Sequence, residues 1–275
     1  MSDKNQSKSV GMDNHAFSGV TMNFIREHYF IPGEFEQLLA RAETMYGEIS
    51  STQMKVAIDV IEDFVSVYPS VFTVRVDLRF PQMVSSDAPD MLICLPKTDA
   101  KVITRFFASL ESQLLAAHHR KGKQGVPAPF GYIWVKEQDA SDFPHYHLIL
   151  LFNKDDYAHL GDYTRQGANN MATRIRKAWC SALGLAFPFY QALAHFPDNC
   201  EYCIARRDAK FHNENYYAFL LRMAYLFKLR TKVPGRRNFD HSRPIGHANK
   251  STIQNIVVDV IKRRAQLLRA LLMEE

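Results

Sequence analysis

The chain has 275 residues, of which 47% are hydrophobic and 23% are charged, with a formal net charge of +5. This is the composition of a soluble globular protein with room for one large domain, or for one domain with an appended helical part. No apolar run reaches the length of a membrane span, and the N-terminus lacks the apolar core of a signal peptide. We therefore expect a cytoplasmic protein with reduced cysteines and no membrane partner.

Changes in polarity divide the chain into four expected parts. Residues 1–20 are polar and predicted to be disordered. Residues 21–70 are predicted to form a helical extension, and residues 71–245 the main domain. Residues 246–275 are predicted to form a C-terminal helix.

The spacing of apolar residues predicts helices and strands in chain order. The expected helices cover residues 32–68, 97–120 (beginning at a Thr98 cap), 166–183, 213–230 and 251–275 (beginning at a Ser251 cap). The expected strands cover residues 72–80, 130–137, 144–152 and, as a short strand, 190–196. A short turn at 138–143 would pair the second and third strands as a hairpin, so we expect an α+β fold around a central antiparallel sheet.

The segment His145-Tyr146-His147 opens an apolar strand. Side chains alternate along a strand, so both imidazoles are expected on one face. If the hairpin turn is centred on Ser141, Glu137 lies directly opposite His145 and shares that face. Two imidazoles and a carboxylate with open positions suit Mg²⁺ or Mn²⁺ acting as a Lewis acid. The alternative is that the histidines are merely packed or solvated strand residues.

A candidate nucleophile lies downstream, where Tyr225 and Lys228 are spaced to share one face of a helix. A nearby ammonium favours tyrosinate and can hold a phosphate oxygen. A phenol above a metal-bound phosphate could attack phosphorus and leave a 5′-phosphotyrosyl link with a free 3′-hydroxyl. Tyr217 is a weaker candidate for a second nucleophile, because it is about 12 Å away along a helix. Aromatic residues at this spacing are otherwise mostly core.

Basic residues surround the candidate nucleophile and predict a phosphate-backbone partner. The expected DNA contacts are Arg222, Arg230, Lys232, Arg236, Arg237 and Arg243. Arg75 and Asp77 lie on the polar face of the strand at 72–80, where they could contact DNA, support the metal ligands or be solvated. The basic helix at 166–183 is expected to face DNA or solvent.

The set Glu137, His145-Tyr146-His147 and Tyr225-Leu226-Phe227-Lys228, in this order, resembles the HUH (His-hydrophobic-His) endonuclease superfamily. More narrowly, it is similar to the rolling-circle replication initiators of filamentous phages and related prophage genes, the inovirus gene-two-like, YagK/YfjJ type. The resemblance implies an RRM-like sheet, a site-specific nick in single-stranded DNA or an origin hairpin, and a covalent tyrosyl-DNA intermediate. The chain departs from the pattern in lacking a second tyrosine at Tyr-x-x-x-Tyr spacing. It also lacks a phosphate-binding helicase loop, so a host helicase is an expected partner.

Three other interpretations remain open at this point. The chain could be a non-catalytic DNA-binding prophage regulator that keeps the fold. It could instead be a metal-dependent phosphoesterase that uses water, although the second His-x-Thr/Ser element of the two-histidine enzymes is not convincingly placed. A zinc site is also conceivable, but the histidine spacing is irregular and free thiols fit better. Its candidate ligands are His195, Cys200, Cys203 and His212.

Overall fold

The computed structural model describes residues 33–81, 96–138, 143–164, 168–210, 212–230, 232 and 237–245. The predicted disordered N-terminus and the predicted helix at 251–275 lie outside these residues. No helix within the described ranges is both long enough and apolar enough to cross a membrane.

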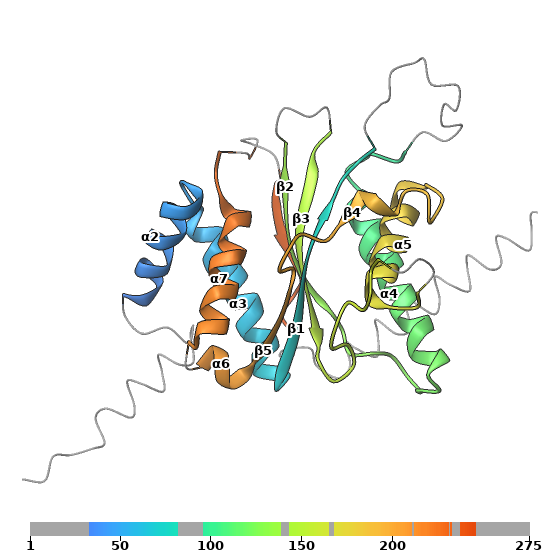
Figure 1. Ribbon diagram of the computed structural model, residues 1–275, viewed down its shortest axis with the longest axis horizontal. Coiled ribbons are helices and arrows are strands. Elements are labelled where there is room, and N and C mark those ends of the chain that lie inside the picture. The colour runs from blue at the N-terminus through green and yellow to red at the C-terminus, as the bar shows by residue number, and fades with distance from the viewer. Residues whose placement is uncertain are drawn as a thin grey trace, which may run out of the picture.

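An open antiparallel sheet forms the centre of the protein (Figure 1). Its strands are β1 (Ser70–Leu78), β2 (Gly131–Glu137), β3 (His145–Asn153), β4 (Ala194–His195), β5 (Glu201–Ala205) and β6 (Phe239–His241). The strand order is β4-β1-β3-β2-β6, and β5 pairs with β1 beside β4. The β2–β3 pairing places Glu137 opposite His145, as the sequence predicts.

Helices cover both faces of this sheet (Figure 1). On one face, α4 (Val102–Arg120) and α5 (Met171–Leu183) pack against the apolar side chains of β1 that include Phe72 and Val74. The other face is covered by α2 (Glu34–Tyr46), α3 (Ser51–Val67) and α7 (Glu214–Ala224), with the short α6 (Arg206–Lys210) beside them. The fold is therefore mixed α/β, with one core on each side of the sheet.

The helices expected in an N-terminal extension share a core with the sheet. Leu38 of α2 and Phe64 of α3 are fully buried in one cluster with Ile149 of β3. The predicted helix at 32–68 is interrupted between α2 and α3, where Gly47 adopts a positive φ of 81° and Ser50 caps α3 by accepting a hydrogen bond from the Gln53 amide. These helices thus belong to the layer that carries the candidate site.

Several predicted boundaries are wrong, and the structure gives the reasons. The helix predicted from residue 97 begins at Val102, so Thr98 does not cap it. A turn precedes the helix, in which the Asp99 carboxylate accepts hydrogen bonds from the Lys101 amide and the Arg105 guanidinium. The short strand predicted at 190–196 is reduced to β4 by a 3₁₀ turn at Gln191–Leu193. The helix predicted at 213–230 ends at Ala224 and continues as a 3₁₀ turn over Tyr225–Phe227. Strands β5 and β6 and helix α6 are not predicted at all.

Candidate metal centre and tyrosine

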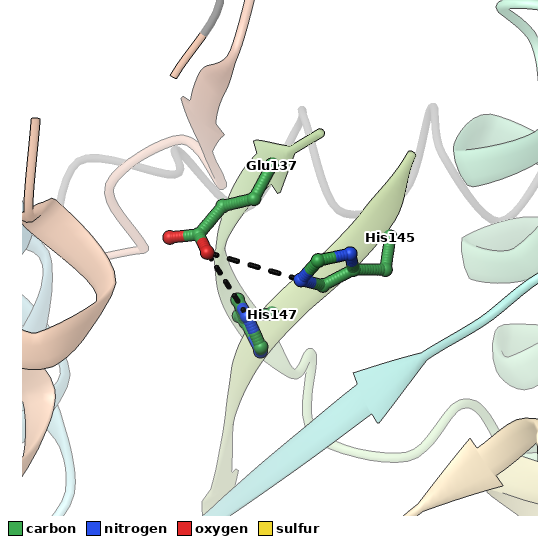
Figure 2. A group of neighbouring side chains, drawn as sticks. All are labelled: Glu137, His145 and His147. Atoms are coloured by element: carbon green, nitrogen blue, oxygen red, sulfur yellow. Dashed lines mark ion pairs between the residues drawn. The ribbon is translucent and has the colours of Figure 1, made fainter. Parts of the chain in front are cut away.

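Glu137, His145 and His147 converge at one end of the β2–β3 hairpin and are called here the Glu/His/His cluster (Figure 2). The Nε2 atoms of His145 and His147 lie 3.8 Å and 3.4 Å from Oε2 of Glu137. One ligand atom from each residue lies within 4.8 Å of the others. Strand alternation and the hairpin register produce this geometry, so this part of the predicted site is brought together as expected.

The cluster is buried on one side and open on the other. Glu137 and His147 are 1% and 6% exposed, whereas the His145 side chain keeps 26% of its surface exposed. Below them, Val135 and Ile149 on the same face of the hairpin are part of the core under α3 and α7. A ligand therefore has access from the His145 side, while the other two residues are held by packing.

Asp77 of β1 lies behind the cluster and fixes the tautomer of His147. The β1–β3 register sets Asp77 opposite His147, and Asp77 Oδ1 is 2.6 Å from His147 Nδ1. Despite burial, which opposes ionisation, the hydrogen bond and charge of His147 hold the pKa of Asp77 below its usual value. A carboxylate accepting from Nδ1–H fixes the tautomer in which Nε2 carries a lone pair, as in carboxylate–histidine–metal arrangements.

The fixed tautomer makes the cluster suited to a cation. With Nδ1 donating to Asp77, the Nε2 lone pair faces the Glu137 carboxylate at 3.4 Å. Two facing acceptors need either a proton or a metal ion between them. In the absence of a metal, burial opposes charging of His147, but hydrogen bonds to Asp77 and Glu137 outweigh it and raise its pKa. Burial, and then the neighbouring His147, lower the pKa of His145 and keep it neutral, which is the form that binds metals.

Tyr225 packs directly on the cluster. Its ring centroid is 5.9 Å from that of His147, and the two rings meet edge to face. The Lys228 ammonium lies 3.8 Å from the centre of the Tyr225 ring, and the Arg75 guanidinium carbon lies 4.7 Å from it. Lys228 Nζ is also 3.3 Å from Glu137 Oε2. The predicted nucleophile and its lysine are therefore brought to the predicted metal ligands, by a 3₁₀ turn instead of a continuous helix.

The α2–α3 connection fixes the segment that carries the tyrosine. The Ser50 amide donates to the Phe227 carbonyl and the Leu229 amide donates to the Glu48 carbonyl, both at 2.9 Å. The Tyr46 ring contacts the Tyr225 ring edge to face, with centroids 5.4 Å apart. The sequence gives no signal for these contacts, because they join residues about 180 positions apart, and the two hydrogen bonds are between backbone groups.

The predicted DNA-contacting residues fall into distinct groups. Arg75 and Asp77 are buried and pair with each other at 3.4 Å, so they are not solvated. Arg75 contacts the Tyr225 ring and Asp77 contacts His147. Arg222, Lys232 and Arg237 contact protein groups: the Asp198 carbonyl, the Gln53 side chain and the Asp240 carboxylate, respectively. Arg230 and Arg243 are exposed, and Arg236 lies outside the described residues.

The alternative zinc site does not form. Among the described residues, the Glu/His/His cluster is the one group of three or more potential ligands close enough to share an ion. His212 lies instead 3.3 Å from Glu34, and burial raises the pKa of the Cys200 thiol to about 11. Cys200 and Cys203 are free thiols, and Cys200 is buried.

Comparison with known proteins places this fold and site in a family. Residues 33–242 match the YagK/YfjJ C-terminal domain, and no solved structure matches the chain. The chain is 41% identical over 181 residues to the uncharacterized protein YagK of Escherichia coli K12, covering 64% of this chain and 85% of that protein. It is 34% identical over 191 residues to the uncharacterized protein YfjJ of the same strain, covering 67% of this chain and 90% of that protein. The matched range includes the Glu/His/His cluster, Tyr225 and both N-terminal helices, and the chain belongs to the YagK/YfjJ C-terminal domain family.

Proposed function

We propose that this protein is a metal-dependent endonuclease and strand transferase of the HUH type, which nicks and rejoins single-stranded DNA to initiate rolling-circle replication. The observation that carries the proposal is the contact between the Tyr225 phenol ring and His147 of the Glu/His/His cluster, at 5.9 Å between ring centres. A metal-ligand set with a phenol beside it is what attack by tyrosine on a bound phosphodiester requires.

Each residue of the site has a role in this proposal. Glu137, His145 and His147 would hold Mg²⁺ or Mn²⁺, which would polarise the phosphate and neutralise charge on its non-bridging oxygens. Asp77 positions His147 through the 2.6 Å hydrogen bond. Lys228 and Arg75 place two positive charges against the Tyr225 ring, where they would attract the phosphate.

The proposed reaction conserves the energy of the phosphodiester. The Tyr225 oxygen forms a bond to phosphorus and releases its proton, while the bond between phosphorus and the 3′ oxygen breaks. That oxygen leaves and takes up a proton as a 3′-hydroxyl, and the 5′ phosphate remains on Tyr225. Attack by a 3′-hydroxyl reverses these steps and joins strands. Partners consistent with this reaction are a single-stranded origin or hairpin and a host helicase, in the cytoplasm.

The test is covalent trapping. The full chain is mixed with Mn²⁺ and single-stranded oligonucleotides that carry candidate origins, and denaturing electrophoresis detects a protein–DNA adduct. We expect an adduct with the natural protein and none with Tyr225→Phe or after chelation. Tyr217→Phe is the matched control, because Tyr217 is half-buried on α7 and contacts Arg41 instead of the cluster.

Other outcomes would refute the proposal. An adduct that persists in Tyr225→Phe would show that another residue is the nucleophile. Metal-dependent cleavage without an adduct, unaffected by Tyr225→Phe, would indicate a phosphoesterase that uses water. Salt-sensitive binding without cleavage under any metal would indicate a non-catalytic regulator.

A further inference from the structure

Helices α4 and α5 cover the face of the sheet opposite the Glu/His/His cluster (Figure 1). Side chains of these two helices and of Asn169 line a basic hollow. Its volume is about 280 Å³, which exceeds what a phosphate group needs. Polar side chains line it, namely Gln113, Arg120, Asn169, Thr173, Arg174 and Lys177. The hollow has no part in the reaction proposed above.

Positive charge in this hollow is not balanced by the residues that line it. Arg120, Arg174 and Lys177 contribute three cationic groups, and none of the described lining residues is acidic. Residues 168–183, which include all of α5, contain no Asp or Glu. Clustered cations in a concave surface focus the field on an anion. The hollow therefore favours the binding of a negatively charged group.

Arg174 is held in place for such a group. Its Nη2 atom donates to the side chain and the carbonyl of Asn169, at 2.8 Å and 3.3 Å. Its Nε atom is buried and has no hydrogen-bond partner among the residues the structure describes. A guanidinium fixed by two bonds pays little entropy when it binds a phosphate.

Aromatic rings contact basic residues of α5, and one of these residues lines the hollow. Lys177, which lines it, has its ammonium 5.1 Å from the centre of the Phe187 ring. Phe189, two residues further on, is 84% exposed, the largest exposure of any described large apolar side chain. On the same helix, the Arg176 guanidinium carbon lies 5.9 Å and 5.4 Å from the centres of the Tyr163 and Phe196 rings. Cations that track a backbone beside rings that can stack on bases form the pattern of single-strand binding.

We infer that the α4–α5 hollow binds a backbone phosphate of single-stranded DNA, and that Phe189 stacks on a neighbouring base. The choice of DNA as the source of the phosphate rests on the proposed function. This second site would hold a strand that has passed from the nicking site on one face of the protein to the opposite face.

The test uses the full chain carrying Tyr225→Phe, which cannot form the proposed covalent link, and measures affinity for a long single-stranded oligonucleotide by fluorescence anisotropy. The test variant is Arg120→Ala with Lys177→Ala, both exposed. The matched control is Arg207→Ala with Lys101→Ala, which removes the same two residue types from other exposed positions. Circular dichroism melting checks that all variants fold.

Counterion release gives the expected size of the effect. A lost single-strand phosphate contact reduces the slope of log K against log salt by about 0.7, which is about fivefold in affinity at 0.1 M salt. Two lost contacts predict a loss of about 25-fold in the test variant. Phe189→Ala is expected to lower affinity by about fivefold or more, whereas a site for free phosphate alone would not depend on that ring.

The inference is overturned if the test variant binds the oligonucleotide as tightly as the control variant, or if Phe189→Ala has no effect. The adduct assay separates this result from the proposed function. An adduct from the natural protein, together with unchanged binding by the test variant, would refute the second site and leave the proposed function supported. Weakened binding by the test variant, together with no adduct from the natural protein, would support the second site and refute the proposed nuclease function.

Discussion

Asp77→Asn tests the geometry of the candidate metal centre with the smallest change. Asp77 is 6% exposed, accepts from His147 Nδ1 at 2.6 Å and pairs with Arg75 at 3.4 Å. Asparagine has nearly the same volume, so packing is kept, but the charge that orients the imidazole is lost. The amide can also present its NH₂ group to Nδ1, which would favour the tautomer with the proton on Nε2, the atom that faces Glu137.

The expected effect on metal affinity follows from this tautomer change. Loss of a carboxylate that supports a ligating histidine typically costs 10- to 100-fold in metal affinity, or about 1.4–2.7 kcal/mol. We expect the Mn²⁺ dissociation constant of Asp77→Asn to rise by this factor in isothermal titration calorimetry. Without bound metal, the free energy of unfolding of Asp77→Asn is also expected to fall, because buried Arg75 loses the charge of its partner, so the titration is made on the folded proteins.

Thr73→Val is the matched control for Asp77→Asn. Thr73 lies on the same face of β1, is 1% exposed, and donates a long 3.4 Å hydrogen bond to the Tyr202 carbonyl. Its replacement perturbs the strand without touching His147, so Mn²⁺ affinity should stay unchanged. Equal Mn²⁺ affinity in Asp77→Asn and the natural protein would refute the argument that Asp77 sets the state of His147.

Three further variants test the energetics of the fold and site. Lys228→Met leaves the buried Glu137 without the ammonium at 3.3 Å, so we expect the metal-free melting temperature to fall, at a cost of about 3–5 kcal/mol, and Mn²⁺ to raise it more than in the natural protein; equal metal-induced shifts would contradict this. Burial, and then the charge of Asp59, raise the pKa of Glu62 from 4.5 to about 9, so the unfolded chain loses this proton first and stability should fall as pH rises between these values. Glu62→Gln should therefore add on the order of 2–3 kcal/mol at pH 7 and flatten the dependence in denaturant titrations, and an unchanged pH slope would count against the buried protonated carboxyl. In Gly131→Ala, the added Cβ would lie 2.4 Å from a Phe64 ring carbon, so we expect a loss of about 1–3 kcal/mol in urea unfolding that Phe64→Leu partly restores in the double variant; additive losses would show that the two residues do not compete for space.

The local part of the site could be predicted from the sequence. Glu137 and His145 are only eight positions apart in the sequence, so the assumption of a symmetric hairpin and the alternation of side chains suffice to pair them. Tyr225 and Lys228 are three residues apart and can contact each other in a helix or in a 3₁₀ turn. The prediction that they lie together is therefore confirmed, although the segment is a 3₁₀ turn. Both inferences depend on neighbours along the chain.

The remaining part depends on contacts that no local pattern encodes. Asp77 reaches His147 only through the β1–β3 register, and the sequence could not choose between support, DNA contact and solvation for it. Strands β5 and β6 are short and are defined by pairing with β1 and β2, so their own periodicity is weak. The pairing of Ile49 with Lys228 likewise joins segments that the sequence assigns to different parts of the chain.

The charges around the Glu/His/His cluster explain why a metal ion and a phosphate would bind together. Asp77 and Glu137 contribute two negative charges, and Arg75 and Lys228 contribute two positive charges, all of them buried. With neutral histidines, the form that binds a metal, these four charges sum to zero. A divalent ion on Glu137 would add two positive charges to this set, so an anion that enters beside the ion would be bound favourably. A phosphodiester supplies that anion beside the Tyr225 ring, which is the position from which a phenol can attack it.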